Sequence, residues 1–450
     1  MEIGDRERPE RQWVTRWAFG LAFLSLLVPA VCQATNGLNL IGSGGISSAL
    51  AGADTAVATD FSAMNTNPAG ITQITGTQAG FSVTVLKPEL HIKNSVNDKN
   101  GENQPLVLPN MGIVHHLSGT PITLGIGFFT VGGNSADFRD IMTTNPLTGL
   151  PTVDKQGTQL RHFKLAPTIA YQVTDKLSLG ASLAVSYVDA SFTLIPNTPS
   201  APGFGFGFET TGKCNRANGL AVPPTSCGYA FGFTPKFGAM YKVSDMVTMG
   251  AAYTMQTPFT LDHGQISKSY LVCGGCRSTF DYKAYGLKWA QDVAVGLAVR
   301  PTKDLLIATK FQWINWEKAL NNVVVQLTNG NNTGAGAPAT DTFVLNYQWR
   351  DQYVAAVGIA YDVTESLNVR GGYNYGNNPV PKTTVDVTNA NIVEHHIVAG
   401  LSYQFTQAVT FDIFSTYAVL HKQPVNNAVF PNATLEVGGY DIGFTLTYQN

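Results

Sequence analysis

The sequence predicts an all-β protein whose strands close into an antiparallel barrel that spans a membrane. Three observations lead to this prediction. Only 13 % of the 450 residues are charged although 44 % are hydrophobic, and a soluble domain carries about twice that charged share. Only one apolar run, near the N-terminus, approaches the length of about 20 residues that a membrane-spanning helix needs. From about residue 77 onward, bulky apolar residues alternate with small or polar ones.

The alternation has a period of two, which places the alternate side chains on opposite faces of a strand. In residues 177–187 the odd positions are Leu, Ala, Val or Tyr, and the even positions are Ser, Gly or Ala. Residues 289–299 and 439–448 follow the same pattern. We expect the bulky face to contact lipid and the small face to line a lumen. A soluble sandwich would also alternate, so strand length and connection length must decide.

The connections alternate between short and long. Six short turns are expected near residues 118–121, 173–176, 243–245, 300–304, 362–366 and 405–407. Seven longer connections are expected near residues 94–105, 139–157, 195–228, 262–280, 320–346, 378–391 and 423–433. This predicts a 14-stranded antiparallel barrel, because bacterial outer-membrane barrels have an even strand number with short turns at one end. Closure leaves no exposed sheet edge. Aromatic girdles are expected at Trp289, Trp313, Trp316 and Trp349, and core aromatics of a sandwich are the alternative.

The two chain ends indicate export and membrane assembly. Residues 17–31 are almost wholly apolar, follow Arg11 and Arg16, and precede small residues up to Ala34. This predicts a signal peptide over residues 1–34, with a membrane anchor as the alternative. In the last strand, residues 443–448 resemble the C-terminal signal that the barrel-assembly machinery of Gram-negative bacteria reads. We therefore expect the cell outer membrane as the location.

Four cysteines fall in Gly- and Pro-rich segments that we expect to be loops, namely Cys214, Cys227, Cys273 and Cys276. In an oxidising compartment such cysteines usually form disulfides. Three pairings are possible, and 214–227 with 273–276 is the most local. A metal site or a redox motif is the alternative. No βαβ pattern surrounds the cysteines and the first pair is spaced too widely for a zinc knuckle, so neither a metal nor a cofactor is expected.

Residues 35–76 differ from the rest because they are rich in Gly and Ala and do not alternate. About 40 residues with small side chains cannot form an independent core, but they could pack inside a barrel. The expected organisation is a signal peptide (1–34), an N-terminal hatch that plugs the lumen (35–76) and a barrel (77–450).

Three runs in this region, residues 34–37 (ATNG), 49–53 (ALAGA) and 65–70 (NTNPAG), resemble the hatch of the FadL family. This family comprises outer-membrane transporters of long-chain fatty acids and, in a TodX-like branch, of aromatic hydrocarbons. A long third loop also matches, as does Gly132-Gly133 followed by Asp137-Phe138 in the third strand. The resemblance implies capture of a hydrophobic substrate between the third and fourth long loops. The substrate would then enter a lumen pocket beside the N-terminus and exit sideways at a kink in the third strand.

The resemblance also implies roles for individual residues. Substrate-binding candidates are Leu38, Thr130, Phe204, Phe206 and Phe208. Gating candidates are Asn67, Pro68 and Ala69 of the hatch, which would face the strand kink at Gly132 and Gly133. The alternatives are an ordinary turn at the Asn-Pro-Ala motif, a lumen position filled by the hatch at the two glycines, and a small loop core for the three phenylalanines.

The charge pattern bears on the substrate and on rival functions. Fatty-acid members of the family have a basic residue just after the fifth strand, and residues 189–194 contain none, which favours neutral substrates such as aromatic hydrocarbons. Arg161, His162 or Lys164 could substitute only if they face the lumen. A porin would need a constriction with opposed charges, and an enzyme would need a histidine with a partner at the rim, so neither is expected. A surface receptor or adhesin remains an alternative.

The expected partners follow from the same arguments. They are outer-membrane lipid and lipopolysaccharide, a hydrophobic small molecule, and the barrel-assembly machinery during biogenesis. Nucleic acid is not expected, because 28 Lys and Arg face 30 Asp and Glu and nucleic-acid binding needs a basic excess. The protein is expected to be a monomer.

Overall fold

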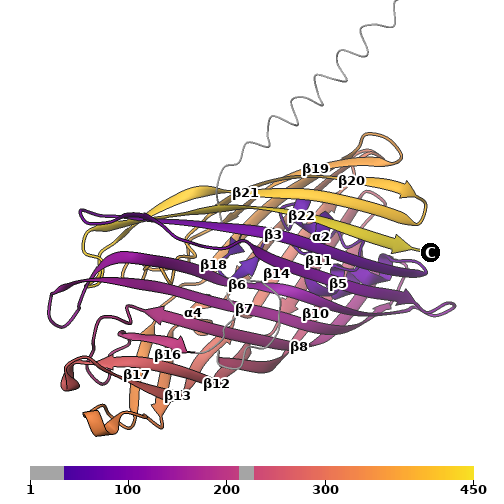
Figure 1. Cartoon of the computed structure of the whole chain (residues 1–450). Coiled ribbons are helices and arrows are strands. Elements are labelled where there is room, and N and C mark those ends of the chain that lie inside the picture. Colours follow the sequence, from indigo (N-terminus) through magenta and orange to yellow (C-terminus); the bar gives the residue numbers. More distant parts are fainter. Residues whose placement is uncertain (1–34, 212–227) are drawn as a thin grey trace, which may run out of the picture. The chain divides into compact units, whose positions relative to one another are not determined.

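The computed structural model describes residues 35–211 and 228–450 (Figure 1). The predicted signal peptide and the cysteines Cys214 and Cys227 lie outside these residues. Among the described residues, the helices are all too short or too polar to cross a bilayer.

The barrel wall is an antiparallel sheet in which each strand pairs with the next around the ring. In order, the strands are β3 (Thr77–Lys93), β5 (Leu106–His116), β6 (Ile122–Thr144), β7 (Pro151–Gln172), β8 (Leu177–Leu194), β10 (Gly228–Lys242), β11 (Val247–Thr254), β14 (Asp292–Val299), β15 (Leu305–Ile314), β18 (Gln352–Asp362), β19 (Leu367–Gly376), β20 (His395–Thr406), β21 (Val409–Val425) and β22 (Ala433–Gln449). The pairing of β22 with β3 closes the ring.

The other strands extend or line this ring. Towards the long loops lie β4 (Asp98–Asn100), β9 (Phe208–Thr211), β12 (Thr257–Tyr270), β13 (Cys276–Trp289), β16 (Asn322–Thr328) and β17 (Asp341–Asn346). At the N-terminus lie β1 (Thr35–Asn36) and β2 (Asn39–Leu40). The helices are all short: α2 (Gly44–Ala49), α3 (Ala63–Thr66), η1 (Pro68–Gln73), η2 (Leu271–Cys273), α4 (Trp316–Ala319) and η3 (Thr333–Ala335).

The sheet as a whole is divided into more strands than the expected fourteen, because it contains 22 strands in the described residues. Some segments that the alternation presents as one strand are interrupted. The segment after residue 247 breaks at residues 255–256 into β11 and β12, and the next breaks at residues 290–291 into β13 and β14. Short strands such as β4 and β9 add to the total. An interruption of two residues leaves the alternating pattern almost intact, so the sequence does not reveal it.

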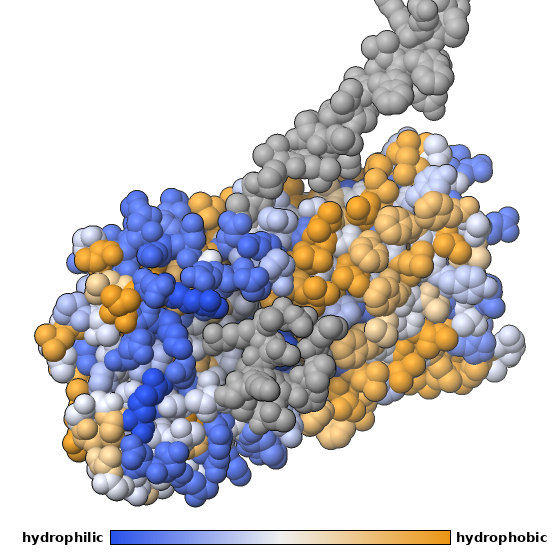
Figure 2. Space-filling model, viewed as in Figure 1, coloured by the Kyte–Doolittle hydropathy of each residue, from blue (hydrophilic) through white to orange (hydrophobic). Residues whose placement is uncertain are grey.

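The two faces of the wall have the polarity that the alternation predicts. On β8, Leu179 and Leu183 are 46 % and 54 % exposed, whereas Ser182 between them in the pattern is 6 % exposed. The bulky side chains therefore point outward and the small polar ones point inward. Figure 2 shows hydrophobic residues gathered over the half of the barrel that carries the short turns, and hydrophilic residues over the half that carries the long loops. Such an apolar outer band is typical of a membrane barrel.

Residues 35–76 pack inside the ring against glycines of the wall. Phe61 lies against Gly80 and Gly112 of β3 and β5, and the backbone at Thr55 lies against Gly250 and Gly296 of β11 and β14. A side chain at these glycines would collide with the inner segment. Glycine on the lumen face therefore leaves the space that the N-terminal segment occupies.

Candidate functional site

The wall contains an unpaired stretch between β5 and β6. These strands pair only from Asn110–Phe129 to His116–Thr123, and residues 106–109 of β5 pair with β3 alone. At one end of the opening, the Thr130 hydroxyl donates to the carbonyl of Pro109 over 2.8 Å. At the other end, the Glu102 amide donates to the carbonyl of Asp137 over 2.6 Å. The sheet therefore has a gap in its side, which we call the β5–β6 gap.

The gap lies where β6 bulges at Val131, immediately before Gly132 and Gly133. The register of β6 against β7 shifts between Thr130 and Gly132, which marks a β-bulge. A Cβ on Gly132 would collide with the carbonyl oxygen of Leu38, and one on Gly133 would collide with that of Leu160. The Gly133 amide also donates to the Leu38 carbonyl over 2.9 Å. Only glycine permits this close approach.

The N-terminal hairpin of β1 and β2 takes the place that β5 leaves free. Asn39 of β2 pairs with Gly132 of β6, so the hairpin binds the strand edge from the lumen side. An unpaired strand edge would leave its amides and carbonyls without partners inside a membrane. The hairpin satisfies part of that edge and thereby makes the gap compatible with a stable wall.

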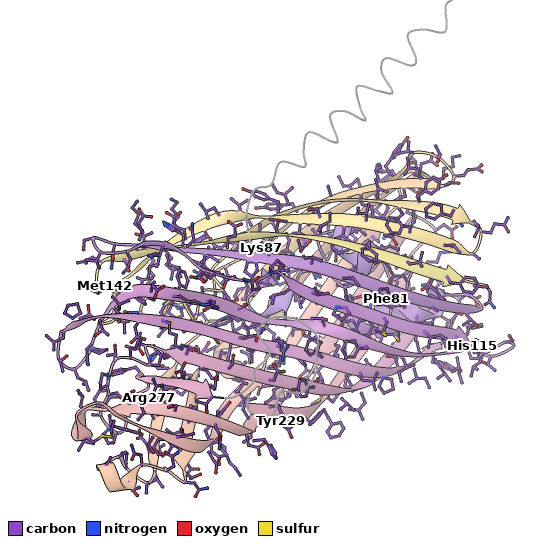
Figure 3. All side chains as sticks on the ribbon, in the orientation of Figure 1. Phe81, Lys87, His115, Met142, Tyr229 and Arg277 are labelled. Atoms are coloured by element: carbon purple, nitrogen blue, oxygen red, sulfur yellow. A yellow bond between two sulfur atoms is a disulfide. The ribbon has the colours of Figure 1, made fainter. Side chains whose placement is uncertain are left out.

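A mainly apolar cavity of about 50 Å³ lies in the gap. Its lumen side is formed by Leu40 of the hairpin together with Leu86, Leu106 and Leu108 of β3 and β5. The cavity is also lined by three residues of β7, the strand that pairs with β6 on the other side of the bulge: Leu160, Arg161 and Phe163. Figure 3 labels Lys87 and Phe81 on β3, the strand that borders this region. The cavity thus places hydrophobic side chains at the β5–β6 gap.

A second cavity of about 100 Å³, which we call the lumen cavity, lies beside the first. Leu40 and Thr130 line both cavities. The lumen cavity is also lined by Asn39, by Trp289 of β13 and by a charged set from the hatch and the wall, namely Asp54, Lys164, Lys236, Asp292 and Lys310. The predicted pocket residue Thr130 is therefore at both cavities. Leu38 is 2 % exposed and contacts the bulge without lining either cavity.

The structure removes the reason for expecting a neutral substrate, because basic side chains do face the lumen. Residues 189–194 contain no cation, and Asp189 is held by Arg161 at 2.6 Å. Lys164, however, faces the lumen cavity, as do two more lysines from β10 and β15. The sequence could not reveal this, because the three lysines come from distant strands that only closure of the ring brings together.

The Asn-Pro-Ala motif contacts β8 and β10. The Asn67 side-chain amide donates to the carbonyls of Thr55 and Ala239 over 2.7 and 3.1 Å. Pro68 and Ala69 lie against Gly180 of β8. The segment that lies directly against Gly132 is the Leu38–Asn39 hairpin. The motif instead joins the inner segment to β8 and β10.

The three phenylalanines of the third long loop line neither cavity. Phe204 is 44 % exposed and its ring centroid lies 6.1 Å from that of Phe206. Phe208 is fully buried and its ring lies 4.9 Å from that of Phe343 on β17. Phe206 and Phe208 are thus buried within the loop, whereas Phe204 is partly exposed.

Cys273 and Cys276 form a disulfide around the turn that follows η2. This is the local pairing that the sequence favours for these two cysteines. The described residues contain no cluster of His, Cys, Asp and Glu that could hold a metal ion.

Three of the four tryptophans expected in aromatic girdles are buried instead. Trp289, Trp316 and Trp349 are 5 %, 0 % and 2 % exposed, and their rings form a chain with centroid separations of 6.0 and 5.4 Å. The interruption at residues 290–291 reverses the alternation of inward and outward side chains between β13 and β14. Trp289 therefore points inward. The girdle expectation is therefore wrong for these residues.

Sequence reasoning missed the contacts of Trp289. Its indole nitrogen donates to the Asn39 side-chain oxygen over 2.7 Å, and its ring lies 4.3 Å from the His162 ring in an edge-on arrangement. The only sequence signal is a tryptophan at the end of an alternating segment. At such a position the pattern does not reveal whether the side chain points inward or outward.

Comparison with known proteins agrees with this geometry. The family model described as "Outer membrane protein transport protein (OMPP1/FadL/TodX)" matches residues 22–449. None of the curated proteins compared with the chain matches it. Among solved structures, the toluene transporter TodX of Pseudomonas putida is 18 % identical, covers 92 % of this chain and 99 % of its own, and has a TM-score of 0.74.

Two further structures share the fold. The toluene transporter TbuX of Ralstonia pickettii is 20 % identical with a TM-score of 0.69, over 91 % of this chain and 99 % of its own. A FadL homologue of Pseudomonas aeruginosa is 15 % identical with a TM-score of 0.70, over 92 % and 99 %. The family match spans nearly the whole chain and confirms the resemblance. The chain therefore belongs to the OMPP1/FadL/TodX family of outer membrane transport proteins.

Proposed function

We propose that the protein takes up small hydrophobic molecules, either aromatic hydrocarbons or long-chain fatty acids, and releases them sideways into the outer membrane through the β5–β6 gap. Relatives in the fold include proteins described as toluene transporters and a FadL homologue. The observation that carries the proposal is that residues 106–109 of β5 pair with β3 but not with β6, and that an apolar cavity lies at this place in the wall.

Lateral release suits such cargo. An apolar molecule is unfavourably solvated in a water-filled channel, and burial in an apolar environment is favourable. In the β5–β6 gap, leucines of β3, β5 and the hairpin offer a continuous apolar surface. Cargo that leaves through this surface reaches lipid without crossing the periplasmic water.

The roles of individual segments follow from this route. Residues 35–76 act as the hatch, and residues 77–450 act as the barrel. Leu38 holds the bulge beside Gly132 and Gly133 and controls the gap, while Thr130 contacts cargo at both cavities. Asn67, Pro68 and Ala69 anchor the hatch to β8 and β10. Phe204, Phe206 and Phe208 support the outer loops.

The proposal also includes the oligomeric state, the absence of catalysis and the route of membrane insertion. The protein acts as a monomeric channel without catalysis or a cofactor. It is inserted by the barrel-assembly machinery and surrounded by lipid and lipopolysaccharide.

Uptake measurements test the proposal. Cells of a Gram-negative host, with and without the protein, are supplied with radiolabelled toluene, an alkane or oleate. We expect faster uptake of at least one of them in cells that contain the protein. Equal uptake of all three with and without it would refute the proposed transport.

A pair of variants on β5 tests the lateral route. Leu108 lines the gap, whereas Met111 is 43 % exposed on the outer face. Leu108→Trp should fill the gap and slow uptake, and Met111→Trp should leave it unchanged at equal amounts of folded barrel. Unchanged uptake in Leu108→Trp would exclude the gap as the exit.

A further inference from the structure

We propose that the lumen cavity binds a single aromatic ring that carries one carboxylate, a monoaromatic anion of the benzoate class. This inference rests on the proposed function and specifies its cargo. It differs from both bare aromatic hydrocarbons and long-chain fatty acids.

The size of the cavity indicates one ring. Its volume is about 100 Å³. An apolar protein cavity of about 150 Å³ holds benzene, and sites for drug-sized ligands measure about 300–1,000 Å³. The lumen cavity is smaller than both, so it has room for one ring at most. The chain of a long fatty acid would extend well beyond it.

The wall beside the hairpin offers aromatic contacts. His162 and Trp289 both line the cavity and stand edge-on to each other, with ring centroids 4.3 Å apart. Phe259 lies 5.7 Å from His162 on the other side. Aromatic pairs in such arrangements are favourable beyond the area that they bury. A planar ligand ring in the cavity would add a further aromatic contact to this group.

His162 also has unused hydrogen-bonding capacity. Its side chain is 1 % exposed, and neither ring nitrogen has a hydrogen-bond partner within the part of the chain that the structure describes. Buried polar groups in proteins nearly always have a partner. A neutral imidazole has one donor and one acceptor nitrogen. The donor nitrogen could therefore serve a carboxylate oxygen.

The charges around the cavity leave one positive charge in excess. By formal charge, Lys164, Lys236 and Lys310 contribute three positive charges, and Asp54 and Asp292 contribute two negative ones. One carboxylate would neutralise the excess charge, whereas toluene would leave it unpaired.

Lys164 is the cation best placed to meet the carboxylate. Lys236 donates to the Thr254 hydroxyl over 2.9 Å, while the side chains of Lys164 and Lys310 form no ion pair or hydrogen bond among residues 35–211 and 228–450. Of these two, only Lys164 lies beside His162. Lys164 is only 6 % exposed, and a buried unpaired charge is costly. It lies two residues from His162 on β7, so both side chains are on the lumen face.

Calorimetry on the purified full-length barrel tests the inference with four probes. Benzoate is the ligand class proposed, toluene keeps the ring without the charge, acetate keeps the charge without the ring, and oleate is a long-chain acid. We expect benzoate to bind at least about tenfold more tightly than each of the others, which corresponds to about 1.4 kcal/mol.

Variants assign the charge to Lys164. Lys164→Met should weaken benzoate binding about tenfold and leave toluene binding unchanged, because the two side chains have similar length and differ in charge. The control Lys303→Met makes the same change at a side chain that is 90 % exposed in a short turn, and it should change neither. His162→Phe keeps the ring and should weaken benzoate binding only. If Lys164→Met does not give a folded, heat-modifiable barrel, Lys164→Gln replaces it.

Three results would overturn the inference while leaving hydrophobic transport intact. They are equal affinity for toluene and benzoate, equal affinity for acetate and benzoate, and unchanged benzoate affinity in the Lys164 variant. Failure of the proposed function has a different signature, because cells with the protein would then take up none of the hydrophobic probes faster.

Discussion

The indole nitrogen of Trp289 donates a hydrogen bond of 2.7 Å to the side-chain oxygen of Asn39. Asn39 is also the residue that pairs with Gly132 at the bulge of β6. One residue of the hairpin thus connects β13 on one side with the edge of the β5–β6 gap on the other. The hairpin is held from both sides, so losing either contact should loosen it.

The first prediction concerns this contact. Trp289→Phe leaves the half-buried Asn39 oxygen without its donor, and losing such a hydrogen bond costs about 0.5–1.5 kcal/mol. We expect faster hydrogen exchange in residues 35–43, measured by mass spectrometry. Trp313→Phe is the control, because Trp313 donates to Asp351 over 2.8 Å, away from the hairpin. Equal exchange in the two variants would show that the contact does not hold the hairpin.

The second prediction concerns the bulge. In Gly132→Ala, the new methyl group would collide with the Leu38 carbonyl, and overpacking of this kind costs about 1–3 kcal/mol. We expect a lower midpoint of heat-induced unfolding on gels and altered uptake. Gly334→Ala is the control, since a Cβ there has no neighbour within 4 Å. A Gly132→Ala barrel as stable as this control would contradict the close approach.

The third prediction concerns the anchor of the outer loops. Lys268 and Asp341 form an ion pair of 2.7 Å with side chains 0 % and 2 % exposed. Lys268 also donates to the Phe204 carbonyl over 2.6 Å, and Asp341 accepts from the Gly203 amide over 2.7 Å. Asp341→Asn leaves a buried charge unpaired, which costs about 3–5 kcal/mol.

We therefore expect rapid proteolysis of the segment around Phe204 in Asp341→Asn. Asp245→Asn breaks an ion pair whose carboxylate side chain is 96 % exposed, and it should have little effect. Lys268→Met combined with Asp341→Asn removes both charges and should be cleaved more slowly than Asp341→Asn alone. Identical cleavage of all three variants would show that the pair does not anchor the loop.

Local alternation was enough to predict the faces of uninterrupted strands. Leu179 points outward and Ser182 inward, because period two needs only neighbouring residues. Gly132, Gly133 and Thr130 were named from the family resemblance, because alternation alone does not single them out. Trp289 was placed on the wrong face because its strand ends just before an interruption.

Local sequence patterns could not predict which charged side chains line the lumen cavity. Lys164, Lys236 and Lys310 belong to β7, β10 and β15, and their proximity depends on ring closure and on the path of the hatch. The position of Asn67 depends on the same packing, because its side chain is held by the carbonyl of Ala239 on β10. Long-range packing of this kind leaves no periodic trace in the sequence.

The last prediction concerns the connection between β19 and β20, where Asp386 organises a turn. Its carboxylate accepts hydrogen bonds from the Thr388 amide and hydroxyl and from the Asn389 amide, at 2.7 to 3.0 Å. The same turn reaches the site, because the Thr388 carbonyl accepts a 2.8 Å hydrogen bond from the side chain of Asn134, just past the bulge. Burial raises the pKa of Asp386 from its ordinary value of 3.8, and the hydrogen bonds from Thr388 and Asn389 oppose the rise.

A raised carboxyl pKa means that the folded turn favours the protonated form. The stabilisation is complete below about pH 4, near the ordinary value, and is lost as the pH rises through the raised pKa. Asp386→Asn keeps an acceptor oxygen but cannot ionise. We expect slower hydrogen exchange of residues 383–391 in this variant than in the wild type at neutral pH, after correction for intrinsic rates, and no difference near pH 4. Glu365→Gln, an exposed residue in a short turn, should behave as the wild type. If exchange in Asp386→Asn matches the wild type at every pH, ionisation of Asp386 does not control the turn that contacts the bulge.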